Sequence, residues 1–346
     1  MKKKSINLLF ILGMILLLWV TAVSQTTTTQ STAGQPSEIE RAQTLLTSGK
    51  LDEAIALLSE LQKSATNESQ VNHLMALAYY QKNNFQKAIE FFLLSSKQSA
   101  ANSKQQRQAI QLLAMSYYYL GQVKEAIPHF EQAVAWMPDN SEMNYALGLC
   151  YIKTQNPDKS REAFARMFAV ANATAAAYLL NAQMLMRENI EAAAEKELLK
   201  ALELDPKIPQ ANFLLGEIAI YKANVDAGID YLKKEIALNP AFAMAHYRLG
   251  EAYTRQLKWD LSIAPLQKSI WLNPLFSGPY IVLGKVYLKT GNLANSEAML
   301  RRAIQIDPNN YSAHHLLAQT LQQMNRLEEA KREFEIAAKL QSISER

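Results

Sequence analysis

Small residues recur along this chain at a fixed interval of 34 positions, and this period constrains the fold more than any other feature of the sequence. Prolines recur at the same interval, and one place in their series holds Asn172 instead. Self-similarity at a period of this length is typical of a repeat architecture, in which each repeat is one small unit that stacks on its neighbours. The small residues are Ala114, Gly148, Ala182, Gly216, Gly250, Gly284 and Ala318, and the prolines are Pro138, Pro206, Pro240, Pro274 and Pro308.

The content of one period predicts two helices joined by a turn. Apolar and aromatic side chains lie at helical spacing around each small residue, as Leu147 and Tyr151 do around Gly148. A second small residue follows twelve positions later, which allows two antiparallel helices to approach closely. The proline closes the period because it lacks the N–H that a continuing helix needs. Gly or Asn, which tolerate a left-handed helix end, mark the turn between the helices at Gly49, Asn83, Gly121, Asn189, Gly291 and Asn325.

This pattern resembles the tetratricopeptide repeat. Phrases such as GKLDEAIALL and GQVKEAIPHFEQA are similar to the second helix of that repeat. The resemblance implies an all-α fold, a right-handed superhelical solenoid of about nine helix-turn-helix repeats between residues 35 and 344, with a four-residue insertion at 101–104. The fourth repeat has Asn172 in place of proline, and the sixth has Ala219 and Glu235 at places usually aromatic and small. We expect these two repeats to be less stable.

Composition agrees with a helical protein that has no disulfide framework. The chain has 346 residues, of which 49% are hydrophobic, and only eleven are glycine and eleven proline. Its one cysteine, Cys150, excludes a disulfide framework, a zinc site of several thiolates and an iron–sulfur site. Cys150 lies beside predicted core positions, so we expect a buried and inert thiol.

The first 24 residues have the pattern of a secretory signal peptide. Three lysines precede an apolar run from Leu8 to Val20, and small residues follow where a signal peptidase reads. The run is short for a bilayer span of about 20 residues, although the stretch from Ile6 to Val23 leaves an uncleaved membrane anchor as the alternative. We expect residues 25–36 to form a polar flexible linker and residues 37–346 to form the repeat domain.

An export signal predicts a location outside the cytoplasm. A bacterial periplasm is the simplest destination, and the alternatives are an inner-membrane anchor that faces the periplasm or secretion. The chain carries 36 Lys and Arg against 32 Asp and Glu, and without the three lysines of the signal it is nearly neutral. A neutral chain has no electrostatic footprint for nucleic acid, so we expect no nucleic-acid partner, and a membrane contact only through an uncleaved N-terminus.

No catalytic or cofactor motif occurs in the sequence. A phosphate-binding glycine loop, a dinucleotide fingerprint, an HExxH helix and a nucleophile elbow are all missing. His314 and His315 are adjacent and therefore point in different directions on a helix, and the other histidines stand alone. We therefore expect no catalytic residue, no cofactor and no metal site.

A stack of helical hairpins offers a long concave surface, and proteins resembling this family use the inner face of each first helix to hold a peptide or a helix of a partner. Tyrosine and arginine are enriched where binding energy is concentrated. The alternative for any one tyrosine is that it packs between neighbouring helices. The inward-facing set predicted from the repeat offsets is Tyr80, Tyr118, Tyr119, Tyr145, Lys153, Arg187, Phe213, Glu217, Tyr221, Tyr247, Glu251 and Arg255.

Within this set, Glu217 and Glu251 stand one repeat apart and suggest a local acidic strip beside Arg187 and Arg255. A mixed groove of this kind suits a peptide with both apolar and charged residues. Co-chaperones resembling this family hold a C-terminal carboxylate with an asparagine directly after the small residue, but no asparagine stands there in this chain. A chaperone-tail clamp is therefore not supported.

The sequence predicts an exported, non-catalytic scaffold or adaptor that binds a protein or peptide on its concave face, in a role such as envelope assembly or secretion that the resemblance implies. The alternative is a carbohydrate- or peptidoglycan-associated protein whose tyrosines stack on sugar rings. An enzyme is a third hypothesis, which hydrolysis by the mature chain would support. The last repeat lacks a polar capping helix after Phe334, Ile336, Ala337 and Leu340, so self-association through the C-terminal end is also expected.

Overall fold

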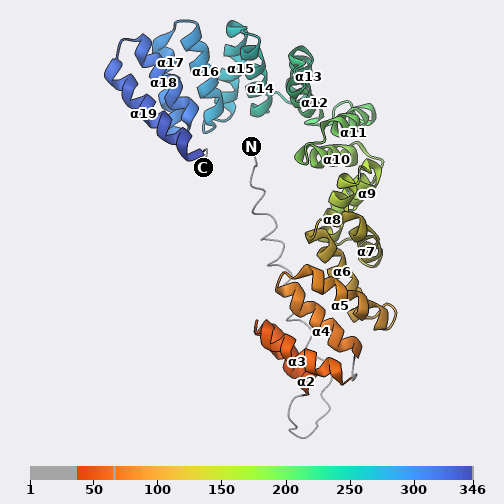
Figure 1. The fold of residues 1–346 in the computed structure, drawn as a ribbon. Coiled ribbons are helices and arrows are strands. Elements are labelled where there is room, and N and C mark those ends of the chain that lie inside the picture. Colours follow the sequence, from red (N-terminus) through yellow and green to blue (C-terminus); the bar gives the residue numbers. More distant parts are fainter. Residues whose placement is uncertain (1–36, 65–67, 345–346) are drawn as a thin grey trace. The chain divides into compact units, whose positions relative to one another are not determined.

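The computed structural model describes residues 37–64 and 68–344 (Figure 1). In this part of the chain the secondary structure consists of the helices α2 to α19, joined by turns and short loops, without a strand. The helices pair in order along the sequence, two to a repeat, so the expected all-α fold of nine helix-turn-helix repeats is confirmed. The predicted signal segment at 1–24 and the linker at 25–36 lie outside the described residues.

The described helices form two compact units that divide between Met167 and Phe168. Unit 1 contains the first four repeats, and unit 2 contains the last five. The helices of unit 1 are α2 (Glu38–Thr47), α3 (Leu51–Lys63), α4 (Glu68–Gln81), α5 (Phe85–Gln98), α6 (Lys104–Tyr119), α7 (Val123–Trp136), α8 (Ser141–Lys153) and α9 (Pro157–Met167). The helices of unit 2 are α10 (Ala175–Arg187), α11 (Glu191–Leu204), α12 (Ala211–Tyr221), α13 (Val225–Leu238), α14 (Ala243–Arg255), α15 (Trp259–Leu272), α16 (Ser277–Lys289), α17 (Leu293–Ile306), α18 (Tyr311–Gln323) and α19 (Leu327–Ser344).

The turn inside each repeat has the same backbone conformation. One residue with a positive φ ends the first helix, and the N–H of the next residue donates to the carbonyl five positions back, as Asn84 does to Tyr79 at 2.9 Å. This arrangement satisfies carbonyls that a helix end leaves free. The left-handed residues are the predicted Gly49, Asn83, Gly121, Asn189, Gly291 and Asn325, and in addition Gln155, Ala223 and Leu257.

Small residues bring the two helices of a repeat into close contact, as the period predicted. A Cβ atom placed on Gly284 of α16 would lie 2.6 Å from Cγ of Leu300 in α17. The hydroxyl of Ser296, the second small residue of that repeat, donates to the carbonyl of Gly284 at 2.9 Å. In unit 1, a Cβ atom on Gly148 would lie 2.6 Å from the ring of Phe164. These distances leave no room for a larger side chain at either glycine.

Four of the turns between repeats are each closed by a side chain from the following first helix. This side chain donates to the carbonyl of the proline six positions earlier, where the chain has no helical partner for that oxygen. The sequence pattern alone did not indicate this contact, because amide, imidazole and phenol groups all make it. The pairs are Asn144 with Pro138 at 2.6 Å, His246 with Pro240 at 3.0 Å, Tyr280 with Pro274 at 3.3 Å, and His314 with Pro308 at 3.0 Å.

The first helices of successive repeats lie closer together than the second helices do. In unit 1, α2, α4, α6 and α8 contact one another in order, and in unit 2, α14 contacts α16 and α16 contacts α18. Helices on the inner side of a curved stack are nearer to each other than those on the outer side. The first helices therefore form the inner face of each unit. α12 and α14 approach each other less closely than α14 and α16 do.

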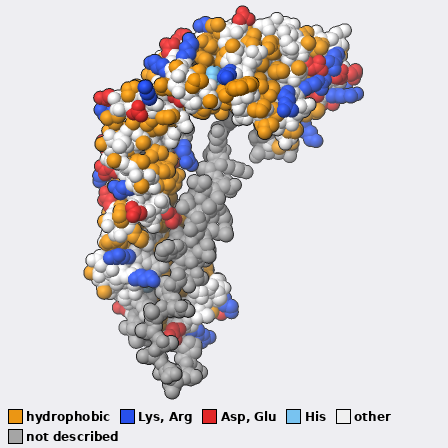
Figure 2. Space-filling model, turned by 180° about the vertical axis from the view of Figure 1, so that it is seen from behind, with side chains coloured by type: hydrophobic (Ala, Val, Ile, Leu, Met, Phe, Trp, Pro, Cys, Tyr) orange, Lys and Arg blue, Asp and Glu red, His pale blue; other side chains and the backbone are white. Residues whose placement is uncertain are grey.

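The surface carries charges of both signs. Figure 2 shows one face of the molecule, on which acidic and basic side chains are scattered among apolar and uncharged ones. This distribution agrees with the near balance of 36 basic and 32 acidic residues in the sequence. Within residues 37–64 and 68–344, none of the helices combines the length and the apolar character that a bilayer span requires.

Candidate functional site

The predicted binding residues divide between the two units, and those of unit 1 are engaged in packing. Tyr80 of α4 and Tyr119 of α6 both contact the ring of Phe85, with ring centroids 5.5 and 4.8 Å apart. Burial raises the pKa of both tyrosines. These half-buried rings join the second repeat to the third, so much of their surface is already occupied by neighbouring helices.

The other predicted residues of unit 1 show the same behaviour. Tyr118 packs edge-on against Phe130 at 6.3 Å, and Tyr145 lies 6.2 Å from Phe164 within its own repeat. The Nζ atom of Lys153 lies 5.7 Å from the centre of the Tyr118 ring, a cation–π distance. Lys153 is exposed, whereas Tyr118 and Tyr145 are half-buried.

In unit 2 three of the predicted charged residues, Glu217, Glu251 and Arg255, lie around one pocket on the inner face, between α12 and α14. Nε of Arg248 lies 3.0 Å from a carboxylate oxygen of Glu217, and its Nη1 lies 2.8 Å from Glu251. Glu251 also accepts a longer contact of 3.4 Å from Arg255. The pocket has a volume of about 190 Å³ and is lined by Glu217, Ile220, Tyr221, Arg248, Glu251, Ala252 and Arg255.

The two sides of this pocket differ in their exposure to water. At its base, burial raises the pKa of Glu217, the charge of Arg248 acts in the opposite direction, and the charge of Glu251 raises it further. At its rim, Tyr221 is 75% exposed and the side chain of Arg255 is 51% exposed. The base therefore contains the ion pairs of Arg248 with two glutamates, whereas the rim contains an exposed phenol and an exposed guanidinium.

Pairs of aromatic rings lie at the start of α12, α14 and α16. Phe213 of α12 packs edge-on against Phe242, the residue before α14, with centroids 5.0 Å apart. Tyr247 of α14 makes the equivalent contact with Phe276, the residue before α16, also at 5.0 Å. The guanidinium of Arg248 lies 5.4 Å from the Tyr247 ring. Arg248 therefore joins the pocket to the aromatic pair of Tyr247 and Phe276.

Glu235 positions the helix that carries half of the pocket. This carboxylate is fully buried and accepts hydrogen bonds from the backbone N–H groups of Gln210 at 2.9 Å and Phe213 at 3.3 Å. Gln210 has a φ of 70° and no side-chain cap at the start of α12, so Glu235 from α13 supplies the acceptor that this helix start lacks. The residue that departs from the repeat pattern therefore has a local partner, and the lower stability expected for this repeat stays a prediction.

Comparison with known protein families agrees with this geometry. Family models described as tetratricopeptide repeat match residues 117–184, 213–274 and 280–341, which together make up more than half of the chain. The chain belongs to the tetratricopeptide repeat family. A model described as anaphase-promoting complex, cyclosome, subunit 3 also matches residues 47–133, in the tetratricopeptide repeats of unit 1.

One curated relative has a local similarity to these tetratricopeptide repeats. The intraflagellar transport protein 88 homolog of Homo sapiens is 28% identical over 97 residues, which is 28% of this chain and 12% of that protein. The chain therefore matches about an eighth of the length of this relative.

Solved structures with similar repeats include MamA, YrrB and the Cut9–Hcn1 hetero-tetramer. A crystal structure of MamA is 23% identical with a TM-score of 0.44 and covers 47% of this chain and 95% of its own. YrrB, titled a TPR protein with an unusual peptide-binding site, is 21% identical with a TM-score of 0.46 and covers 53% and 94%. The Cut9–Hcn1 structure is 18% identical with a TM-score of 0.44 and covers 82% and 55%.

The structure brings together three of the four charged residues that were predicted to form a local strip on the inner face. Glu217, Glu251 and Arg255 line the pocket as a group, whereas Arg187, at the end of α10, is exposed and is not among the lining residues. Sequence reasoning missed Arg248, the residue that links the two glutamates. The spacing of Arg248 three positions before Glu251 was the available signal, since residues three apart share a helix face.

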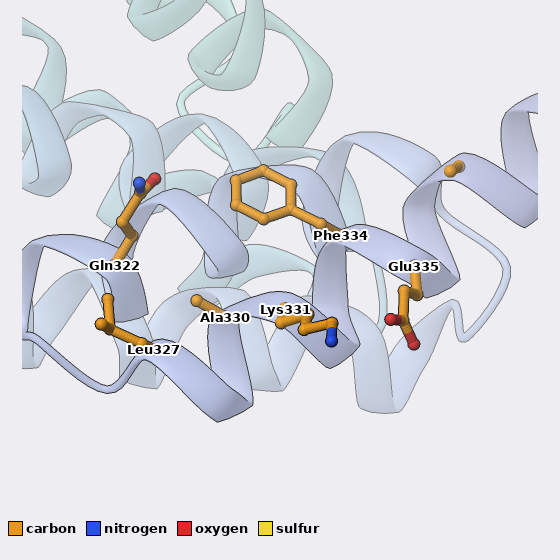
Figure 3. Close-up of a pocket in the computed structure, with 7 residues that line it drawn as sticks. Gln322, Leu327, Ala330, Lys331, Phe334 and Glu335 are labelled. Carbon is orange, nitrogen blue, oxygen red and sulfur yellow. The ribbon is translucent and has the colours of Figure 1, made fainter.

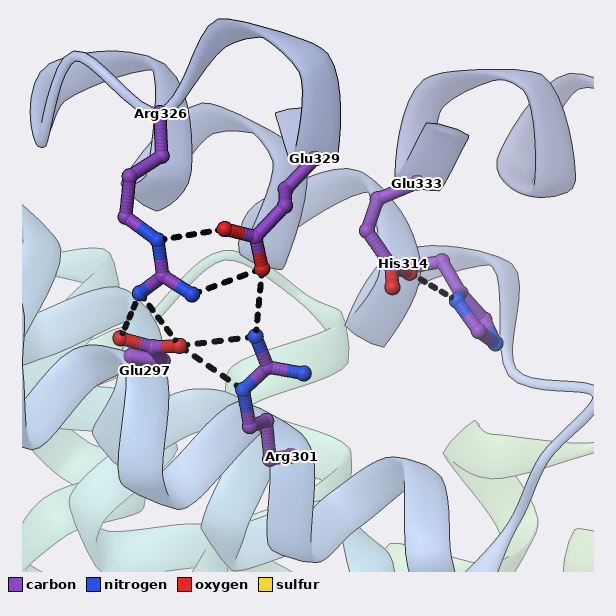
Figure 4. A network of polar contacts seen from close by, with 6 residues as sticks. All are labelled: Glu297, Arg301, His314, Arg326, Glu329 and Glu333. Atoms are coloured by element: carbon purple, nitrogen blue, oxygen red, sulfur yellow. Dashed lines mark hydrogen bonds and ion pairs between the residues drawn. The ribbon is translucent and has the colours of Figure 1, made fainter. Parts of the chain in front are cut away.

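Cys150 and His314 both lie in the packed interior of the repeats. Cys150 is fully buried, as expected, and burial raises the pKa of its thiol to about 12. His314 contacts Glu333 of α19 at 2.6 Å (Figure 4). Its other ring nitrogen lies 3.0 Å from the carbonyl oxygen of Pro308. Within the described residues, no group of three or more His, Cys, Asp and Glu side chains is placed to hold a metal ion.

Proposed function

We propose that this protein is a non-catalytic adaptor that binds an extended peptide segment of a partner protein on the inner face of unit 2. The observation that carries this proposal is the pocket between α12 and α14, where the exposed side chains of Tyr221 and Arg255 lie beside the ion pairs of Arg248 with Glu217 and Glu251. Membership in the tetratricopeptide repeat family supports a role in protein binding. Unit 1 contributes less to the proposal because its tyrosines are packed against each other.

The pocket chemistry favours a peptide with an acidic side chain next to an apolar one. Glu217, Arg248 and Glu251 pair among themselves and together carry one net negative charge, which the guanidinium of Arg255 beside Glu251 offsets. Arg255 has five N–H donors and makes only a long contact of 3.4 Å to Glu251, which leaves donors for a peptide carboxylate. A neighbouring apolar side chain of the peptide would contact Ile220 at the wall of the pocket.

We further propose that the protein acts outside the cytoplasm, in envelope assembly or secretion. The support for this part is the lysine-rich start and apolar run of residues 1–24, which are outside the described structure. Mass spectrometry of the protein purified from cells that express the full chain tests it. A new N-terminus near residue 25 is expected, and an intact Met1 would indicate the anchored alternative.

Selection of short random peptides on the purified protein tests the binding site. We expect selected peptides to combine Asp or Glu with an apolar residue, and their affinity to fall at least about tenfold in Arg255→Glu, because like charges repel at a desolvated contact. Tyr221→Ala should weaken binding as well. Both side chains are exposed, so neither change should alter the fold.

Arg302→Glu is the matched control, because Arg302 is an exposed arginine on α17 that contacts only Gln305 in the described hydrogen bonds. This variant should bind the selected peptides as the unaltered protein does. Equal loss in the control and in Arg255→Glu would mean a general charge effect and would contradict the proposed site. Binding of purified glycan without any peptide selection would favour the carbohydrate-associated alternative instead.

A further inference from the structure

The last repeat of unit 2 presents a groove along α19 that is not covered by any other helix of the described residues. We call it the open surface, and Figure 3 shows its residues following one another along α19, with Gln322 contributed by α18. Leu327 at one end of it is 59% exposed, and Phe334 in its middle is half-buried. The groove has a volume of about 410 Å³ and is lined by Gln322, Leu327, Ala330, Lys331, Phe334, Glu335 and Ala338.

The equivalent residues one repeat earlier show what such a groove binds. We call them the covered surface, because α18 lies over them. Leu300 packs in one cluster with Leu317 and Leu321 of α18, and the hydroxyl of Ser296 lies 2.8 Å from that of Thr320. α17 and α18 are joined by a short loop and therefore run antiparallel. The covered surface is formed by Leu288, Leu293, Ser296, Glu297, Leu300, Arg301 and Ile304.

Charged residues at the edge of the covered surface pair with the repeat that covers it. Glu297 contacts Arg326 at 2.7 Å, and Arg301 contacts Glu329 at 3.4 Å, so each charge of α17 meets an opposite charge from the turn and helix that follow α18 (Figure 4). Arg326 also pairs with Glu329 at 2.7 Å, which joins the residues into one network. Edge charges thus complement one another between one repeat and the next.

The open surface has the same two charged positions with the signs exchanged. Lys331 stands where the previous repeat has Glu297, and Glu335 stands where it has Arg301. Both side chains are exposed. They are four residues apart, so they lie one turn apart on the same side of α19. On the covered surface the equivalent charges pair with the turn after α18 and with α19, whereas a single antiparallel helix pairs with both Lys331 and Glu335 if it presents an acidic and a basic residue with the same spacing.

We propose that this helix is α19 of a second copy of the chain, related by a two-fold axis. A two-fold axis across the groove makes the two α19 helices antiparallel and brings identical surfaces together. With the axis level with Glu333, Lys331 of each copy faces Glu335 of the other. The dimer then contains two equivalent Lys331–Glu335 ion pairs. The same register places each Phe334 level with Arg332 of the other copy, two residues along the axis from both Ala330 and Phe334 of that copy, so the two rings and the two alanines lie around the axis.

The N-terminal end of another copy fits the open surface less well. In α2, Arg41 stands where α18 presents Leu317 to the covered surface, and Ser37 stands where α18 has Ala313. Arg41 and Ser37 are exposed, and Ser37 takes part in a capping box with Glu40. A polar α2 would bury charge against Leu327 and Phe334, which costs free energy without a partner. The antiparallel pairing of two α19 helices has no such cost.

Charge exchange at the two exposed positions tests the proposal. The protein purified from cells that express the full chain is measured by sedimentation velocity over a range of concentrations. We expect the unaltered protein to approach twice the mass of one chain as concentration rises, and K331E and E335K each to raise the dissociation constant of the dimer at least about tenfold, because four like charges then meet.

Mixing the two single variants restores opposite charges, so an equimolar mixture should form a heterodimer, and the double variant K331E/E335K should dimerise like the unaltered protein. Lys196→Glu, an exposed lysine on α11, is the matched control and should not change the dimer. Circular dichroism should give the same helix content for every variant.

Three outcomes would overturn the proposal. The unaltered protein could remain a monomer at every concentration, the single variants could dimerise as tightly as the control, or the mixture could fail to form a heterodimer. A monomer that binds an isolated peptide copy of α2 would assign the open surface to head-to-tail contact instead.

Discussion

The covered surface on α16 and α17 and the open surface on α18 and α19 occupy the same positions in successive repeats, but they have different neighbours. The first is packed against α18 and forms ion pairs with the turn that follows α18, whereas the second is not covered by any other helix of the described residues. In a repeat protein the core lies between repeats as much as within them. The same residue position can therefore be core in one repeat and a binding surface in the next.

The largest difference should appear when a leucine is truncated on each surface. Leu300 is fully buried between α17 and α18, so Leu300→Ala should lower the free energy of unfolding by about 2–5 kcal/mol through lost contacts and a cavity. Leu327→Ala removes a side chain that is 59% exposed, and we expect a change of less than about 0.5 kcal/mol in dilute monomer. Urea unfolding of both variants measures the two values, and similar losses would contradict the comparison.

A smaller loss of stability is expected from substitutions at the small residue of the first helix in each of these two repeats. Gly284 faces Leu300 so closely that an added Cβ would lie 2.6 Å from its Cγ, and Gly284→Ala should cost about 1–3 kcal/mol through overpacking. The last repeat already has Ala318 at this position. Ala318→Gly should cost about 0.5–1 kcal/mol, the ordinary effect of glycine in a helix. Thermal unfolding of the two variants checks the order, and a stabilising Gly284→Ala would contradict the close approach of the helices.

The smallest effect concerns the charges at the edges of the two surfaces. Burial alone would raise the pKa of Glu297, but hydrogen bonds from Arg301 and Arg326 outweigh it, so this pKa lies below the usual 4.5. A carboxylate with a lowered pKa stabilises the folded state above pH 4.5, and this contribution disappears as the pH falls through the lower, folded-state value.

Glu297→Gln should therefore be less stable than the unaltered protein at pH 7, by under about 1 kcal/mol because water screens the network. The difference should vanish in acid well below pH 4.5. Lys331→Gln, the same position on the open surface, should show no such dependence in dilute monomer. Melting temperatures across the acid range test both, and a constant difference for Glu297→Gln would contradict the assigned ion pairs.

The helix pairs could be predicted from sequence because the 34-residue period repeats one local pattern nine times. The turns were predicted where Gly or Asn stands, as at Gly49 and Asn83, but Gln155, Ala223 and Leu257 take the same left-handed conformation. At those three positions the contacts between the two helices fix the turn, and the residue adapts to it. Local preference was therefore sufficient in most repeats, and packing decided the rest.

The candidate site was predicted only in part. Glu217, Tyr221, Glu251 and Arg255 were found because a fixed offset places them on the inner face. The spacing of three residues indicates the contact of Arg248 with Glu251 within α14. It does not indicate the contact with Glu217, because that contact depends on the distance between α12 and α14. The offsets also placed Tyr80 and Tyr119 in the binding set, while the structure packs both against Phe85.

The sequence by itself determined that this chain forms helical hairpins of the tetratricopeptide type, because small residues, aromatics and prolines at a fixed spacing satisfy the backbone and allow close helix contact. Only the tertiary structure decided which of these equivalent surfaces are filled. Burial depends on the neighbour that a surface meets, and Glu297 and Lys331 occupy one position in the repeat with opposite charges. A position in the period fixes where a side chain points, and the neighbouring helix fixes whether that side chain is core or contact surface.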